Sequence, residues 1–123
     1  MANISTEEKI KTAVKALDSK RAEDIQVIGI GDLTIIADYF IIANGMSTTQ
    51  TKALAEEVEF KLSQMGVEPN RTEGYQGQNW IVLDYGDIVV HIFYKETRDY
   101  YKLERLWSDG TPVDISQYLV TEE

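Results

Sequence analysis

The sequence predicts one α/β domain, in which a mixed β-sheet is packed with helices. Apolar residues recur at helical spacing in three segments, while four other segments form strand-length runs rich in β-branched and aromatic residues. The order is helix, strand, strand, helix, a weaker strand, two strands and a last helix, which is typical of α/β or α+β domains. A chain of 123 residues has the size of one such domain.

The first helix is expected to begin after Ser5, because Ser5 and Glu8 have the spacing of a capping box. One face of this helix carries four apolar residues at helical spacing, namely Ile10, Ala13, Val14 and Leu17. A strand over Ile25–Ile30 follows and ends in a glycine-containing turn. Residues Asp38–Ala43 are apolar at both odd and even positions, so we expect a central strand that is covered on both faces.

A second helix is expected after Ser47, which forms another capping box with Gln50. Its apolar stripe consists of Leu54, Ala55, Val58, Leu62 and Met65. Gly66 is placed to end this helix in the left-handed conformation that glycine favours. Beyond it, Pro69 restricts the chain to an edge strand or a loop.

Two further strands, Trp80–Tyr85 and Ile88–Tyr94, flank Gly86-Asp87, a pair that suits a two-residue type II′ hairpin turn. The turn sets the register by placing Tyr85 opposite Ile88. The other predicted pairs are Leu83 with Val90 and Ile81 with Ile92 on one face, and Trp80 with Phe93, Val82 with His91 and Asp84 with Val89 on the other. Both faces are largely apolar, more so than a hairpin with one wet face needs.

A third helix is predicted over Thr97–Trp107, and Gly110 and Pro112 end it. We therefore divide the chain into a domain of residues 1–110 and an acidic C-terminal tail of residues 111–123. The tail either docks as a short strand or stays loose. Its apolar residues for docking are Ile115, Tyr118 and Leu119.

The charge balance restricts the partners, because 21 acidic and 12 basic residues give a formal net charge of −9. Such a surface repels phosphate backbones, so direct binding of nucleic acid is disfavoured and a basic protein partner is favoured. The lack of cysteine excludes disulfides and thiolate chemistry. With no signal peptide and no apolar run of about 20 residues, we expect a cytoplasmic protein without membrane contact.

Three features are candidates for chemistry, and each has a simpler structural interpretation. His91, the only histidine, is either a catalytic base or a packed or partner-facing ring. The turn Gly45-Met46-Ser47 either binds an anion or only turns the chain and caps the helix. Asp38, Asp84 and Asp87 either chelate a divalent ion or serve the turns in which they lie. The simpler interpretations predict no catalysis, no metal and no other cofactor.

Three motifs follow one another at short spacings between residues 5 and 107. They are Ala37-Asp-Tyr-Phe-Ile-Ile-Ala-Asn-Gly-Met-Ser47, then, after Glu73-Gly74, Trp80-Ile-Val-Leu-Asp-Tyr-Gly-Asp-Ile-Val-Val-His-Ile-Phe93, and finally Glu96-Thr-Arg-Asp-Tyr-Tyr-Lys-Leu-Glu-Arg-Leu-Trp107. Together they resemble the ribosomal silencing factor family, also called the Iojap family. The resemblance implies a nucleotidyltransferase-like fold without the catalytic residues, and no Asp-x-Asp pair follows the Gly45-Met46-Ser47 turn at the spacing those enzymes use.

The resemblance also implies a function, since family members are taken to bind the large ribosomal subunit through its fourteenth protein. Binding there blocks an intersubunit bridge and small-subunit joining, which represses translation; the free protein is expected to be a homodimer. The implied partner-binding residues are Trp80, Ile81, Leu83, Tyr85, Asp87 and His91 on the hairpin, and Tyr101, Lys102, Leu106 and Trp107 on the third helix. Two alternatives stay open: a dimeric protein–protein adaptor, and a metal-dependent nucleotidyltransferase that uses Asp38, Asp84 and Asp87.

Overall fold

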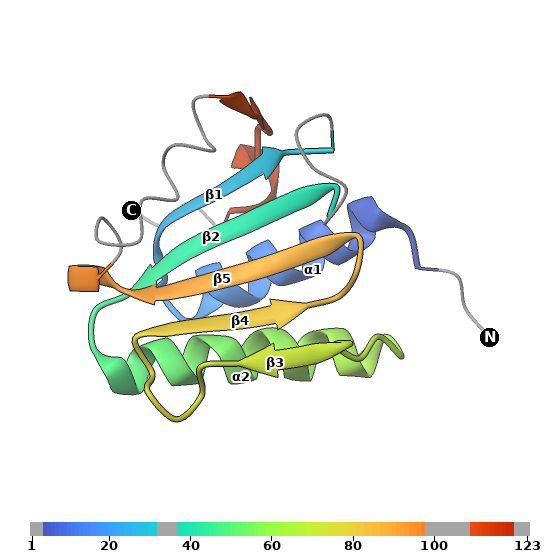
Figure 1. Ribbon diagram of the computed structural model, residues 1–123. Helices are drawn as coiled ribbons and strands as arrows, with labels where there is room; N and C mark the ends of the chain where they lie inside the picture. Colours follow the sequence, from blue (N-terminus) through green and yellow to red (C-terminus); the bar gives the residue numbers. More distant parts are fainter. Residues whose placement is uncertain (1–3, 32–36, 98–108, 120–123) are drawn as a thin grey trace.

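The computed structural model describes residues 4–31, 37–97 and 109–119. Within these residues the strands form one mixed sheet in the order β3-β4-β5-β2-β1-β6 (Figure 1). The strands are β1 Glu23–Gly29, β2 Tyr39–Gly45, β3 Arg71–Glu73, β4 Trp80–Asp84, β5 Ile88–Tyr94 and β6 Thr111–Pro112; the helices are α1 Thr6–Ser19 and α2 Thr48–Gln64, with short 3₁₀ turns at Lys95–Thr97 and Ser116–Tyr118. The predicted α/β domain with a mixed, helix-packed sheet is confirmed.

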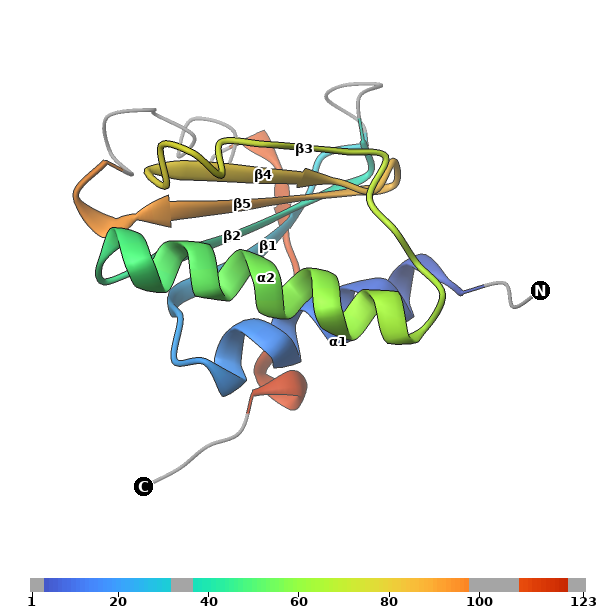
Figure 2. The same cartoon turned by 90° about the horizontal axis from the view of Figure 1, so that it is seen from below.

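Both α-helices lie side by side against one face of the sheet (Figure 2). The Ser5 hydroxyl accepts a hydrogen bond from the Glu8 amide at 3.1 Å, and the Ser47 hydroxyl accepts one from the Gln50 amide at 3.0 Å. The Gln50 side chain in turn accepts from the amide of Met46, one residue before the position that a capping box uses. Both helices therefore begin at the predicted serine caps.

Two glycines fix the ends of α2. Gly66 has a φ of 82°, and the amides of Val67 and Gly66 donate to the carbonyls of Leu62 and Ser63, both at 2.9 Å. These are the two hydrogen bonds of a Schellman motif, so the predicted helix end is confirmed. At the other end, a Cβ on Gly45 would lie 2.5 Å from the Thr51 hydroxyl oxygen. Glycine there allows β2 to run directly into the helix.

The hairpin of β4 and β5 has the predicted register in every pair, from Trp80 opposite Phe93 to Asp84 opposite Val89. The Tyr85 amide donates to the Ile88 carbonyl at 2.9 Å, and Gly86 has the positive φ of 92° that the turn requires. On its other side β5 pairs in parallel with β2. The short edge strand β3 pairs with β4, in the segment that Pro69 restricted to an edge strand or a loop.

The sheet has two buried faces of different composition. The face that α1 and α2 cover, here called the helix face, is mainly aliphatic and includes Ile41, Ile81, Leu83, Val90 and Ile92. The opposite face, here called the aromatic face, consists of Ile28, Ile30, Ala37, Phe40, Ile42, Val89 and Phe93, with Trp80 and Val82 packed against them. Alternate residues of β2 point to the two faces, which confirms its prediction as a central, doubly covered strand.

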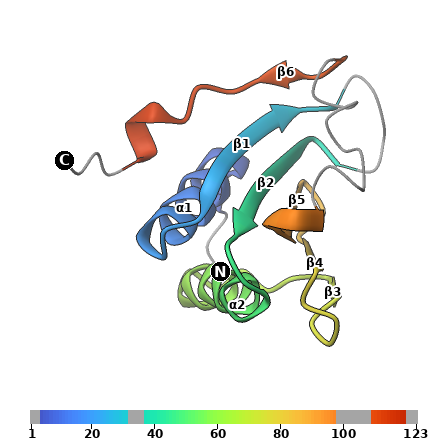
Figure 3. The ribbon, with the colours of Figure 1, turned by 90° about the vertical axis from the view of Figure 1, so that its left-hand side faces the viewer.

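The described part of the tail docks on the sheet. Strand β6 pairs with β1 at the sheet edge opposite β3 (Figure 3), and the Val113 amide donates to the Val27 carbonyl at 2.9 Å. The side chains of Ile115 and Tyr118 are buried in the same apolar cluster as α1 and α2. Docking through these residues is thus the alternative that the structure adopts, whereas the predicted helix over Thr97–Trp107 falls largely on residues 98–108, outside the described part of the chain.

Candidate partner-binding site

Trp80 is the predicted site residue that the structure leaves partly exposed on the aromatic face. It opens β4, and its ring stacks on Phe93 of the neighbouring strand with centroids 5.2 Å apart. Its indole nitrogen donates a hydrogen bond to Nδ1 of His91 at 3.0 Å. The indole is thus fixed by a ring contact and a polar contact, while the residue stays partly exposed, as is typical of aromatic anchors at protein interfaces.

His91 itself is 6% exposed and lies between the rings of its neighbours. Its imidazole meets Phe40 edge-on at a centroid distance of 4.5 Å and lies nearly parallel to the ring of Phe93 at 6.3 Å. Burial lowers the pKa of His91 to about 4, and the charge of Asp84 opposes this change only in part. The ring is therefore neutral at physiological pH and packed, which is the simpler of the two interpretations of this histidine.

Three other predicted binding residues are buried on the helix face. Ile81 and Leu83 are fully buried, and Tyr85 is 6% exposed, because alternate residues of β4 point toward α2. Burial raises the pKa of the Tyr85 hydroxyl, and the carboxylates of Glu59 and Glu68 add to this effect. A partner can contact these side chains only if the fold opens, so their predicted direct contact is replaced by a role in the core.

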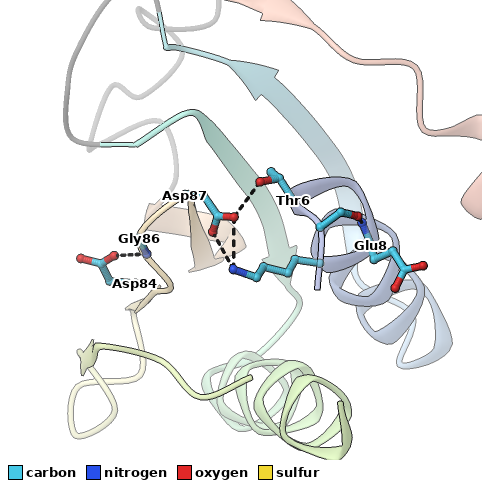
Figure 4. Close-up of polar contacts among 7 residues, drawn as sticks. Thr6, Glu8, Asp84, Gly86 and Asp87 are labelled. Atoms are coloured by element: carbon cyan, nitrogen blue, oxygen red, sulfur yellow. Dashed lines mark hydrogen bonds and ion pairs between the residues drawn. The ribbon is translucent and has the colours of Figure 1, made fainter. Parts of the chain in front are cut away.

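Asp87 has an internal role as well, shown in Figure 4. Its carboxylate accepts a hydrogen bond from the Thr6 hydroxyl at 2.7 Å and forms an ion pair with Lys9 at 3.1 Å. Burial alone would raise the pKa of Asp87, but the hydrogen bonds from Thr6 and Lys9 and the charge of Lys9 outweigh it and lower the pKa. The predicted acidic contact thus joins the hairpin turn to the start of α1.

Two of the three carboxylates proposed as metal ligands, those of Asp84 and Asp87, are engaged in separate contacts, whereas Asp38 contacts the hairpin turn through its backbone amide, which donates to the Asp87 carbonyl. Asp84 points away from Asp87 in Figure 4, accepts a hydrogen bond from the Gly86 amide at 2.9 Å and lies 3.7 Å from Arg71. In the described ranges, no three side chains of His, Asp or Glu are grouped so that they could hold a metal ion. The structure therefore assigns Asp84 and Asp87 to turn and helix contacts.

The Gly45-Met46-Ser47 turn uses its polar groups internally. The Met46 amide donates to Gln50 Oε1, and the carbonyl of Ser47 accepts from both the amide and the hydroxyl of Thr51. These contacts fit the simpler interpretation of a turn that caps α2.

The aromatic neighbours Phe40 and Phe93 were not among the predicted site residues, although they support Trp80. For Phe93 the predicted register already contained the signal, because it places Trp80 opposite Phe93 and diagonal to His91 on one face. Phe40 comes from β2, whose pairing with β5 the sequence did not predict. The predicted residues Tyr101, Lys102, Leu106 and Trp107 lie outside the described part of the chain. Among the helices that the structure describes, none has the length and apolar character to cross a membrane.

Known proteins share both the sequence and the fold. The family model described as "Ribosomal silencing factor during starvation" matches residues 3–123. A ribosomal silencing factor of Halalkalibacterium halodurans is 39% identical over 112 residues, which are 91% of this chain and 96% of that protein. A mouse protein named mitochondrial assembly of ribosomal large subunit protein 1 is 32% identical over 102 residues, 80% of this chain and 45% of that protein.

The fold comparison agrees with the sequence comparison. The crystal structure of a protein from Chromobacterium violaceum superposes with a TM-score of 0.83 at 35% identity and covers 94% of this chain and 98% of that chain. Since the family model extends to residue 123, the match includes the docked tail as well as the motifs of the hairpin. The chain therefore belongs to the ribosomal silencing factor family.

Proposed function

We propose that this protein binds the large ribosomal subunit through its fourteenth protein, covers an intersubunit bridge and keeps the small subunit from joining. Family membership supports the ribosome as the target, and the name of the mouse relative points to the large subunit. The observation that carries the proposal for this chain is Trp80, a partly exposed indole held by Phe93 and His91 on the aromatic face. Such a fixed aromatic side chain is suited to act as the anchor of a protein interface.

The charge of the chain supports a protein contact over an RNA contact. A net charge of −9 opposes close approach to ribosomal RNA, whereas most ribosomal proteins are basic and attract an acidic partner. Inhibition then requires no chemistry, because a bound protein excludes the small subunit from the space it occupies. The free fraction of large subunits falls as the concentration of the factor exceeds its Kd.

Subunit sedimentation tests this function. Purified protein is added to separated large and small subunits, and the gradient fractions are probed for the protein and for joined particles. We expect co-migration with the large subunit and fewer joined particles. If the protein stays at the top of the gradient while the subunits join, the proposed function is wrong, and the dimeric adaptor becomes the leading alternative.

Trp80→Ala tests the anchor in the same gradients. An interface anchor costs about 2 kcal/mol or more when truncated, so the affinity should fall by about 30-fold or more while the variant stays folded. Phe60→Ala is the matched control, because Phe60 is an aromatic residue that is 55% exposed on α2, away from the aromatic face. Equal losses for the two variants would contradict a specific anchor at Trp80.

The oligomeric state belongs to the same proposal. We expect the free protein to be a homodimer in the cytoplasm, where ribosomal subunits meet. Light scattering after gel filtration measures its mass against the 14.0 kDa of one chain. Repeating the measurement with Trp80→Ala shows whether self-association and ribosome binding use the same surface.

A further inference from the structure

We propose that His91 is a positioning residue, which holds the Trp80 indole in the orientation that it presents to the ribosomal partner. This inference rests on the proposed function, and it replaces the direct partner contact predicted for His91 with an indirect role. The hydrogen bond from Trp80 Nε1 to His91 Nδ1, at 3.0 Å, carries the inference. It joins a buried side chain to the partly exposed one beside it.

The hairpin register brings the two residues together. Trp80 pairs with Phe93 and Val82 with His91, so Trp80 and His91 are diagonal neighbours on one face of the β4–β5 ladder. Stacking on Phe93 fixes the plane of the indole, but it does not by itself select which edge of the ring faces the protein. The hydrogen bond makes that selection, because it requires the N–H edge to face His91.

The imidazole is well suited to this task because its neighbours confine it. Phe40 and Phe93 confine its ring, and only 6% of the residue is exposed. An indole N–H can only donate, so Nδ1 of His91 must be the acceptor and the neutral ring carries its proton on Nε2. A neutral ring at physiological pH agrees with the low pKa of about 4.

The other ring nitrogen shows that packing alone does not explain a histidine at this position. Nε2 of His91 is buried and has no hydrogen-bond partner in the described part of the chain. A buried donor without a partner lowers stability, and a phenyl ring would fill similar space without that cost. What histidine adds here is the acceptor at Nδ1, whose bond partner is the Trp80 indole.

Fixing the indole in advance should strengthen binding, because less side-chain freedom is then lost when the partner docks. We expect His91→Phe to weaken binding to the large subunit about two- to tenfold, because the indole then has to be ordered when the partner docks. His91→Asn places its side-chain carbonyl oxygen near the position of Nδ1 and should recover much of the loss. A wild-type affinity in His91→Phe would overturn the proposal.

A double-mutant cycle separates positioning from a general structural role. Trp80→Phe keeps an aromatic ring but removes the N–H donor, so His91→Phe should have no further effect on affinity in that background. If His91→Phe weakens binding equally in both backgrounds, it does not act through the indole, and the proposal fails. Circular dichroism and thermal unfolding establish that each variant is folded at the temperature of the binding assay.

The free protein gives a readout that requires no ribosome. The Nε1–H resonance of Trp80, assigned by its loss in Trp80→Phe, should shift in His91→Phe and exchange faster with water, and should return toward its wild-type position in His91→Asn. An unchanged resonance in His91→Phe would disprove the contact. If the wild type shows the bonded resonance but binds no large subunit, the proposed function is wrong and the positioning role falls with it.

Discussion

The two faces of the sheet are both buried, but they are packed with different kinds of side chain. The helix face is filled by aliphatic residues such as Leu83 and Ile92, which are fully buried beneath α1 and α2. The aromatic face packs Phe40 and Phe93 around a histidine and leaves Trp80 partly exposed. The helix face has the larger buried cluster and should contribute more of the stability, whereas the partly exposed Trp80 makes the aromatic face the one that we propose for recognition.

The strongest test of this difference between the faces is to truncate two neighbouring residues on β4, one on each face. Leu83→Ala removes a fully buried side chain on the helix face and should lower the free energy of unfolding by about 2–5 kcal/mol. Val82→Ala truncates the adjacent, partly exposed residue on the aromatic face and should cost about 1 kcal/mol. Urea denaturation measures both values.

The affinity of the same variants for the large subunit sharpens the result. Leu83 was predicted as a binding residue, yet its burial implies that the folded Leu83→Ala protein should bind like the wild type. A similar stability loss in both variants would mean that the two faces contribute equally to the fold. If fully folded Leu83→Ala binds the large subunit more weakly than the wild type, Leu83 contributes to partner binding after all.

The sequence predicted the register of β4 and β5 and divided their residues between two faces, but it could not show which of the two faces the helices cover. Gly86-Asp87 defined the turn, and every strand pair followed from it. Both faces of the hairpin are apolar, however, so alternation alone did not show that Ile81, Leu83 and Tyr85 lie under the helices. The helix caps were predictable because a cap depends on residues three or four positions apart.

Contacts between segments that are distant in the sequence could not be predicted from the sequence. The carboxylate of Asp87 meets Thr6 and Lys9 about eighty positions earlier in the chain, and nothing in the local pattern of either segment specifies this pairing. The bond between Trp80 and His91 is different. The predicted register already made these residues diagonal neighbours, so the donor and acceptor could have been matched from the sequence.

Acid pH provides a second test, directed at the aromatic face alone. His91 has a pKa of about 4 in the folded protein, below its ordinary value of 6.5. Below pH 6.5 His91 of the unfolded chain is protonated, whereas His91 of the folded chain stays neutral until about pH 4. The contribution of His91 to the free energy of unfolding should therefore be constant above pH 6.5 and should fall by about 3 kcal/mol as the pH drops to 4.

The control for the pH dependence is His91→Asn, which retains an acceptor but does not titrate. Urea denaturation at several pH values between 4 and 7 should give a steeper loss of stability for the wild type than for this variant. Asp87 does not affect this difference between the two proteins, because its pKa is lowered and its stabilising effect is lost only below the pH range of the measurement. Parallel curves for the two proteins would show that His91 is not buried in its neutral form.

The smallest expected effect concerns the end of the hairpin, where Asp87 joins the turn to α1. Asp87→Asn removes the charge that pairs with Lys9 in a site where both side chains are about four-fifths buried, and should cost about 1 kcal/mol of stability. Glu23→Gln is the matched control, because its ion pair with Lys95 is about half exposed at 3.7 Å and should contribute less than about 0.5 kcal/mol. Since the Asp87 carboxylate is engaged by Thr6 and Lys9, we expect unchanged affinity for the large subunit in Asp87→Asn. A loss of affinity without a loss of stability would instead make Asp87 the acidic contact that the resemblance implies, and the recognition surface would then extend beyond the aromatic face to the hairpin turn.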